Sequence, residues 1–234
     1  MKNPVQAEID AILEKAMIGE PRNMQQAIGP SEIGSDCEHC VAAKLAGWVQ
    51  SEEAAWLPWV GTAMHAYLEP IFEKHPDYLT ENRVSVTPWL SGTSDLFHIP
   101  SGTNVDWKLV GATTLKSAKR GPTPTYRVQA HCYGLGYLRA GFEVNNVAIY
   151  YLPRNAISLS SGVFWSEPFD PLIALEAIGR AERMMDKIAS FTTTEERDAY
   201  VTSLPRGAHC WDCARYPDAP KASPHTTLDS LLGV

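Results

Sequence analysis

The sequence lacks the features of a membrane or secreted protein. It has no uninterrupted apolar run of 18 or more residues, so a transmembrane helix is not expected. Residues 1–17 are of mixed polarity and lack the apolar centre of a secretion signal. The chain has 234 residues, 44% of them hydrophobic, and no internal repeat, which suits one globular domain with appendages. We therefore expect a soluble cytoplasmic protein with no membrane partner.

Acidic residues are absent between Trp107 and Phe142. The whole chain carries a net charge of −7, which argues against non-specific coating of nucleic acid. Within this stretch every charged side chain is basic: Lys108, Lys116, Lys119, Arg120, Arg127 and Arg139. An acidic protein with one basic strip is typical of a groove that binds phosphates, although a solvated basic loop has the same composition.

Cysteines are few, but four of the five form two pairs. Cys37 and Cys40 are separated by two residues, as are Cys210 and Cys213, whereas Cys132 stands apart. Two such pairs in a chain without a secretion signal indicate a metal site, because the short spacing lets two thiolates reach one ion. Two disulfides or a thioredoxin-type redox pair are less favoured. The pattern does not identify the metal, and we expect Cys132 to pack in the core.

Periodicity and turn residues predict alternating blocks of helix and strand. The predicted helices cover residues 5–20, 31–47, 52–74 with a break or kink at Pro58, 125–140, 171–190 and 193–203. The predicted strands cover residues 82–87, 93–99, 104–110, 147–152 and 158–165. The first three strands are expected to form an antiparallel meander, which places Asp95 and Asp106 on adjacent strands.

The triplet Asp106-Trp107-Lys108 lies in one of these strands. Side chains alternate between the faces of a strand, so Asp106 and Lys108 share a face and Trp107 points to the other. Two carboxylates, from Asp95 and Asp106, with an ammonium group beside them suit metal-assisted hydrolysis of a phosphodiester. Such a triplet is common by chance, so its neighbours decide its meaning.

Four short motifs follow one another along the chain: Gly61 to His65, Gly92 to Asp95, Asp106 to Lys108, and Gln129 to Tyr133. In this order they resemble the motifs of RecB-like nucleases of the PD-(D/E)xK superfamily, in particular the CRISPR-associated and phage-type iron–sulfur exonucleases. The resemblance covers roughly residues 31–216. It implies an α/β restriction-endonuclease-like core, a central mixed sheet flanked by helices, with helical additions. Residues 1–30 would be a helical extension and residues 217–234 a flexible C-terminal tail.

The same resemblance implies a role for each motif residue. His65, Asp95, Asp106 and the backbone carbonyl of Trp107 would bind Mg²⁺ or Mn²⁺. The catalytic set would be Lys108, Asp95, Asp106, Gln129 and Tyr133, with Lys108 stabilising the transition state. Nucleic acid would contact Lys116, Lys119, Arg120, Tyr126, Gln129 and Tyr133. Taken singly, His65 suits a core histidine and the tyrosines suit core aromatics; only the ordered set favours a nuclease.

The cysteine pairs match this family with one departure. Its iron–sulfur members use one cysteine before the first motif and three near the C-terminus, whereas this chain has two and two. The resemblance favours a [4Fe–4S] cluster on Cys37, Cys40, Cys210 and Cys213, and a structural Zn²⁺ is the alternative. With either group, the cysteines would form a metal staple between the two ends of the domain.

The expected function is therefore a metal-dependent DNA exonuclease that acts on single strands or duplex ends. It would serve recombination, repair or replication in a bacterial or phage-infected cell, with possible partner proteins of those processes. Two alternatives remain open. One is an endonuclease or a CRISPR-adaptation-type processing nuclease, and the other is a DNA-end-binding module without catalytic activity.

Overall fold

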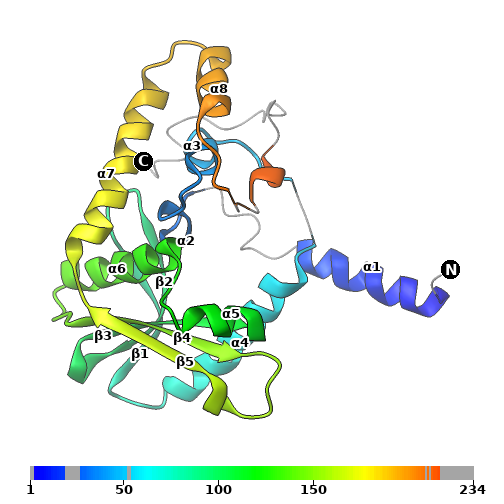
Figure 1. The fold of residues 1–234 in the computed structure, drawn as a ribbon, viewed down its shortest axis with the longest axis vertical. Helices are drawn as coiled ribbons and strands as arrows, with labels where there is room; N and C mark the ends of the chain where they lie inside the picture. Colours follow the sequence, from blue (N-terminus) through cyan, green and yellow to red (C-terminus); the bar gives the residue numbers. More distant parts are fainter. Residues whose placement is uncertain (1–2, 19–26, 52–53, 209, 211, 217–234) are drawn as a thin grey trace.

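A computed structural model describes residues 3–18, 27–51, 54–208, 210 and 212–216 (Figure 1). The predicted C-terminal tail, residues 217–234, lies outside the described residues. Among the helices of the described segments, none combines the length and the apolar character needed to cross a bilayer.

A five-stranded mixed sheet forms the centre of the molecule, with strand order β1-β2-β3-β4-β5. The strands are β1 (Tyr78–Ser85), β2 (Ser91–His98), β3 (Thr103–Val110), β4 (Asn146–Pro153) and β5 (Val163–Pro168). β1, β2 and β3 form the antiparallel meander predicted from the sequence, with the short 3-10 helix η2 (Ile99–Ser101) at its second turn. β4 runs parallel to β3, and β5 pairs antiparallel with β4. The mixed sheet expected from the sequence is thus confirmed.

Two strands begin at least four residues from their predicted start, and the other strand boundaries lie within three residues of the prediction. β1 begins at Tyr78, four residues before the expected start. The segment 158–165 was expected to be a strand, but the short 3-10 helix η3 (Leu159–Ser161) occupies its beginning and β5 starts only at Val163. The reason is local: the Ser158 hydroxyl accepts a hydrogen bond from the Ser160 backbone N–H, and a serine that bonds its own backbone favours a turn.

Helices cover both faces of the sheet. α4 (Trp56–Phe72) packs on the face that carries Trp107, where Phe72 contacts the Trp107 ring. α6 (Pro124–Arg139) packs on the other face, where the Tyr137 ring stacks on Phe97 at 4.1 Å between ring centroids. The prediction that Trp107 packs away from Asp106 is therefore correct.

The parallel step from β3 to β4 passes through two helices. α6 begins where the Thr123 hydroxyl accepts the backbone N–H of Tyr126, with Pro124 in the first turn. Before it lies α5 (Ala112–Ala118), which was not among the predicted helices. Leu115 and Ala118 of α5 pack into the core while its basic residue, Lys116, remains exposed.

A second group of helices lies beside the sheet. It consists of α2 (Pro30–Ile33), α3 (Glu38–Leu45), α7 (Pro171–Ala189), α8 (Thr194–Ser203) and the short 3-10 helix η4 (Asp212–Arg215). The single helix expected over residues 31–47 is wrong, because it divides into α2 and α3. At Gly34 a Cβ would lie 2.7 Å from Cβ of Val128 on α6, so the chain turns there in close contact. Arg180 of α7 binds the freed carbonyls of Ile33 and Ser35 at 2.6 and 2.7 Å.

The N-terminal helix α1 (Pro4–Ile18) projects from the rest of the chain (Figure 1). Its described residues agree with the helix predicted from residue 5, and residues 19 and 20 of that prediction lie outside the described residues. Its apolar residues Val5, Ile9 and Ile12 are exposed, and Met17 is buried. The longer helix α7 instead buries its apolar face against α3 and α6.

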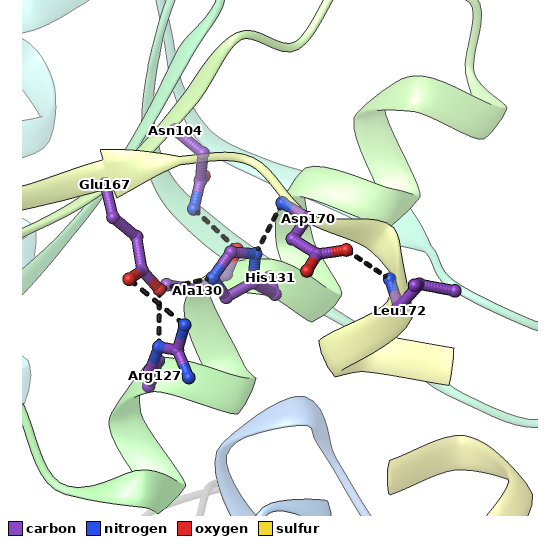
Figure 2. Close-up of polar contacts among 7 residues, drawn as sticks. All are labelled: Asn104, Arg127, Ala130, His131, Glu167, Asp170 and Leu172. Carbon is purple, nitrogen blue, oxygen red and sulfur yellow. Dashed lines mark hydrogen bonds and ion pairs between the residues drawn. The ribbon is translucent and has the colours of Figure 1, made fainter. Parts of the chain in front are cut away.

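A buried histidine links α6 to β5 and α7 (Figure 2). His131 is fully buried, and its Nδ1 accepts the backbone N–H of Asp170 at 3.2 Å. Its Nε2 therefore carries the proton and donates to Glu167 Oε1 at 2.7 Å. Arg127 of α6 forms two further bonds to the Glu167 carboxylate, and the Asp170 side chain accepts the N–H of Leu172 at the start of α7. Three elements thus depend on one imidazole.

Replacing this imidazole tests the link. We expect His131→Ala to lower the free energy of unfolding by about 2–4 kcal/mol, because Glu167 and the Asp170 N–H lose a buried partner. Burial lowers the pKa of His131 in the folded state below its ordinary 6.5. The contribution of the neutral ring is therefore complete above pH 6.5 and is lost as the pH falls through the lower folded-state pKa. Urea unfolding from pH 4 to 8 measures both effects.

The exposed His75 supplies the control. His75→Ala should cost much less than His131→Ala and leave the pH dependence of the wild-type protein unchanged. A His131→Ala variant as stable as the wild-type protein at pH 8 would show that the link contributes nothing.

Candidate metal centre and catalytic residues

Three carboxylates lie in one row across the first three strands. In the register of β1 and β2, Thr80 pairs with Leu96 and Asn82 with Ser94, so Glu81 lies opposite Asp95. β2 and β3 pair up to Leu96 and Val105, so the next residues, Asp95 and Asp106, also lie opposite each other. Glu81, Asp95 and Asp106 therefore form a row of carboxylates across the three strands, called the carboxylate row below.

His65 of α4 reaches this row from the side. Its Nδ1 lies 3.3 Å from Asp95 Oδ1 and 3.4 Å from Glu81 Oε1. One donor atom from each of the three residues fits within 4.8 Å of the others. Neighbouring ligands of an octahedral ion at metal–ligand distances near 2.1 Å are about 3 Å apart, so these separations fit one divalent cation.

His65 is protonated at neutral pH without such an ion. Burial by itself lowers the pKa of His65, but the carboxylates of Asp95 and Glu81 outweigh burial and raise it to about 9. The imidazolium therefore stands where a cation would bind, and neutralises part of the charge of the two carboxylates.

Asp95 also fixes the geometry of the next strand. Its Oδ2 accepts the backbone N–H of Trp107 at 2.7 Å, at the point where the regular pairing of β2 and β3 has ended. The two oxygens of one carboxylate therefore serve two purposes, since Oδ1 faces His65 while Oδ2 holds β3 in place.

Asp106 is almost completely buried, with 2% of its surface exposed. Its Oδ2 lies 2.6 Å from Lys108 Nζ, whereas neither oxygen meets the geometry of a hydrogen bond with any described residue. Burial raises the pKa of Asp106 to about 6, against the opposing effect of Lys108. A buried carboxylate oxygen without a donor is unusual, and it fits a position beside a cation.

Lys108 remains charged in this environment. Burial lowers its pKa, but Asp106 and Asp95 outweigh that effect and raise it above the ordinary value. Its Nζ also lies 4.8 Å from the ring centroid of Tyr126, a cation–π contact. Tyr126, expected to stack on a base, thus packs against the ammonium group in this structure.

Gln129 and Tyr133 lie inside the protein, each with 5% of its surface exposed. Gln129 Oε1 has no hydrogen-bond partner among the described residues. Tyr133 packs with Val84, Phe97 and Tyr137. Both residues are on α6, which packs on the sheet, so their side chains lie inside the protein rather than at the surface.

The two motif glycines, Gly61 and Gly92, differ in how closely other atoms pack against them. At Gly92 a Cβ would lie 2.9 Å from Cδ of Pro30 and 3.1 Å from Cε1 of Tyr133, so no side chain fits there. At Gly61 an added Cβ would meet nothing within 4 Å. The Gly92 motif therefore has a packing reason that also connects Tyr133 to the strand of Asp95, and the Gly61 motif has none in the described residues.

The basic strip divides into two parts. Lys116, Lys119 and Arg120 are exposed on α5 and directly after it. Arg127 binds Glu167, and Arg139 donates to the carbonyl of Val86. The first part is available to a ligand, whereas the second stabilises the fold.

The four paired cysteines come together at a separate place. Cys37 and Cys40 at the start of α3 meet Cys210 and Cys213 near η4, so the predicted four-cysteine cluster is confirmed. Cys132 lies outside it, buried in the core.

Glu81 is the site residue that sequence reasoning missed. It belongs to none of the four motifs, and its backbone has φ 43°, a left-handed conformation that is uncommon for glutamate. Its place was nevertheless accessible from the sequence. Counting outward from the turn at Thr87 to Trp89 along both strands of the hairpin pairs Glu81 with Asp95.

Solved structures with a similar fold are exonucleases. An alkaline exonuclease (LHK-Exo) from Laribacter hongkongensis matches with a TM-score of 0.52 and 9% identity, over 82% of this chain and 94% of that one. LHK-Exo in complex with dAMP matches with a TM-score of 0.51 and 12% identity, over 75% of this chain and 90% of that one. A phage-related exonuclease from Haemophilus somnus 129PT matches with a TM-score of 0.46 and 11% identity, over 65% of this chain and 80% of that one. No family model and no curated protein matches the sequence.

The two LHK-Exo structures confirm the restriction-endonuclease-like α/β fold that the four motifs implied. The resemblance to RecB-like PD-(D/E)xK nucleases is supported at the level of the fold.

The protonated state of His65 predicts proton release on metal binding. A ligand imidazole must be neutral, so Mn²⁺ binding at pH 7 should release about one proton per ion. Calorimetry in buffers of different ionisation enthalpy measures this number. His65→Gln should reduce it towards zero, whereas the control His75→Gln should not change it. Equal release by the wild-type protein and His65→Gln would exclude His65 as a ligand.

Proposed function

We propose that this chain, which has the fold of PD-(D/E)xK exonucleases, hydrolyses phosphodiester bonds of DNA with Mg²⁺ or Mn²⁺. The observation that carries the proposal is the convergence of His65, Glu81 and Asp95 beside the buried pair of Asp106 and Lys108. Hard oxygen donors with one imidazole suit these two cations.

The donor atoms of His65, Glu81 and Asp95 lie close enough together to bind one ion. Asp106, which is outside that group of three, and the backbone carbonyl of Trp107 are the further proposed ligands. The three carboxylates would also balance the charge of a divalent cation. A bound divalent cation would acidify a water molecule and neutralise charge on the scissile phosphate. Glu81 extends the ligand set that the sequence motifs alone implied.

Lys108 acts by charge in this proposal. Its raised pKa keeps the side chain an ammonium group, which makes it a poor proton acceptor. It is therefore assigned to stabilising the negative charge that grows on the phosphate in the transition state. Asp106 and the Tyr126 ring hold it in place for that task.

The remaining motif residues are assigned by position. Lys116, Lys119 and Arg120, exposed on and after α5, would follow the phosphate backbone. Gln129 and Tyr133 are buried, so we assign them to positioning the strands of the metal ligands; direct contact of either residue with DNA is a second possibility that the same variants test. DNA is the proposed substrate because the similar exonuclease LHK-Exo has a structure in complex with dAMP, a deoxynucleotide.

Substitution of the central residues tests the activity. We expect Asp106→Ala to abolish Mn²⁺-dependent digestion of end-labelled DNA, and Lys108→Met to slow it by about a hundredfold or more. The exposed residues Asp77 and Lys74 provide matched controls, since Asp77→Ala and Lys74→Met should digest DNA at the wild-type rate. Digestion that persists unchanged in the Asp106→Ala preparation would not come from this site. The chain would then be a DNA-binding module without catalytic activity.

The cysteine cluster favours digestion from an end. It joins the beginning and the end of the domain, and a closed domain suits threading of a free DNA terminus. Linear single- and double-stranded DNA should therefore be degraded, whereas covalently closed circular DNA should remain intact under the same conditions. Equal rates on circular and linear DNA would indicate an endonuclease instead.

A further inference from the structure

We propose that Cys37, Cys40, Cys210 and Cys213 bind a single tetrahedral Zn²⁺ and not a [4Fe–4S] cluster. The resemblance to iron–sulfur exonucleases favoured the cluster, but the positions of the sulfur atoms do not fit it. This proposal is independent of the nuclease activity, because the cysteines and the carboxylate row are separate groups of residues.

The four sulfur atoms lie close together. Cys37 Sγ is 3.3 Å from Cys213 Sγ, and Cys40 Sγ is 3.5 Å from the sulfurs of both Cys210 and Cys213. All four lie within 4.8 Å of one another.

These distances distinguish a site for one zinc ion from a cluster of four irons. In a tetrahedral site with Zn–S bonds near 2.3 Å, the sulfurs are about 3.8 Å apart. In a cubane each thiolate binds a different iron, and the sulfurs are roughly 6 Å apart. The observed separations surround one ion, and a cubane would require the three sulfur pairs at 3.3–3.5 Å to separate by about 2 Å or more.

The surrounding backbone leaves little room for that expansion. At Gly207 a Cβ would lie 3.3 Å from Cβ of Cys37 and 2.6 Å from Asp36 Oδ1, so the segment before Cys210 already touches the start of α3. The N–H of His39 donates to the carbonyl of Pro205 at 3.1 Å and holds the same two segments together. The segment before Cys210 and the start of α3 are thus held in close contact, which suits a site for one ion between them.

The position of Cys37 and Cys40 also suits thiolates. Cys37 is the N-cap of α3 and Cys40 lies in its first turn, where the helix end favours negative charge. His39 is fully buried beside them, with its Nδ1 3.9 Å from Cys40 Sγ and its Nε2 3.3 Å from Arg206. An imidazole at this distance supports a ligand sulfur rather than binding the ion itself.

Zinc has no redox chemistry, so the proposed role is mechanical. The ion would join α3, which packs on α7 and α8, to the segment that contains η4. None of the residues of the carboxylate row belongs to this segment.

Metal analysis of the whole protein tests the proposal. The chain is purified without oxygen from iron-supplemented cells, so that a cluster would be filled and preserved. We expect a colourless protein with one cysteine-bound zinc per chain and neither iron nor acid-labile sulfide. A brown protein with four irons and four sulfides per chain would overturn the assignment. Failure of the reduced, metal-free protein to bind added Zn²⁺ or Co²⁺ would overturn it as well.

Variants distinguish this site from the carboxylate row. Cys210→Ser should lose the zinc and the thiolate-to-Co²⁺ absorption of the cobalt-substituted protein, while Cys132→Ala, a cysteine outside the cluster, retains both. Cys210→His should retain zinc, because three cysteines and one histidine also form a zinc site. Asp106→Ala should retain it too, so failure of the nuclease proposal leaves this result unchanged. Full zinc content in Cys210→Ser would contradict the proposal.

Discussion

The carboxylate of Asp95 is the constraint on which the rest of the site depends. One oxygen holds the Trp107 N–H and so fixes where β3 leaves β2, and the other faces His65 on a different element. The direction of Asp106 and Lys108 follows from the position of Trp107 between them. Because a single side chain sets both the strand and the polar cluster, the geometry of the cluster is built into the sheet.

Sequence patterns predicted the parts of the fold that depend on local chemistry. The alternation in β2 and β3 and the turns between them give the meander, and the opposed positions of Asp95 and Asp106 follow from it. The division of α2 from α3 depends on contact of Gly34 with α6, far along the chain, and no local pattern contains that information. The strand predicted from residue 158 starts too early for the opposite reason. The turn at Ser158 is a local feature, but the prediction gave more weight to the β propensity of the segment.

Motif spacing named His65, Asp95, Asp106 and Lys108 as candidate site residues, because each belongs to a short pattern. The structure brings these four side chains together. Glu81 belongs to no pattern and becomes a neighbour of His65 only through pairing with Asp95. The burial of Gln129 and Tyr133 likewise follows from how α6 packs on the sheet, which their spacing within the helix does not reveal.

The separation of the cysteine pairs along the chain has a consequence for biosynthesis. Cys37 and Cys213 are 176 positions apart, so their sulfurs can meet only after the ribosome has synthesised the segment up to Cys213. The sheet and its covering helices are complete in sequence before then, since β5 ends at Pro168 and α7 at Ala189. The cluster can therefore close only after the sheet and its covering helices have been synthesised, so it joins an early and a late segment of the chain across a domain that can already be folded.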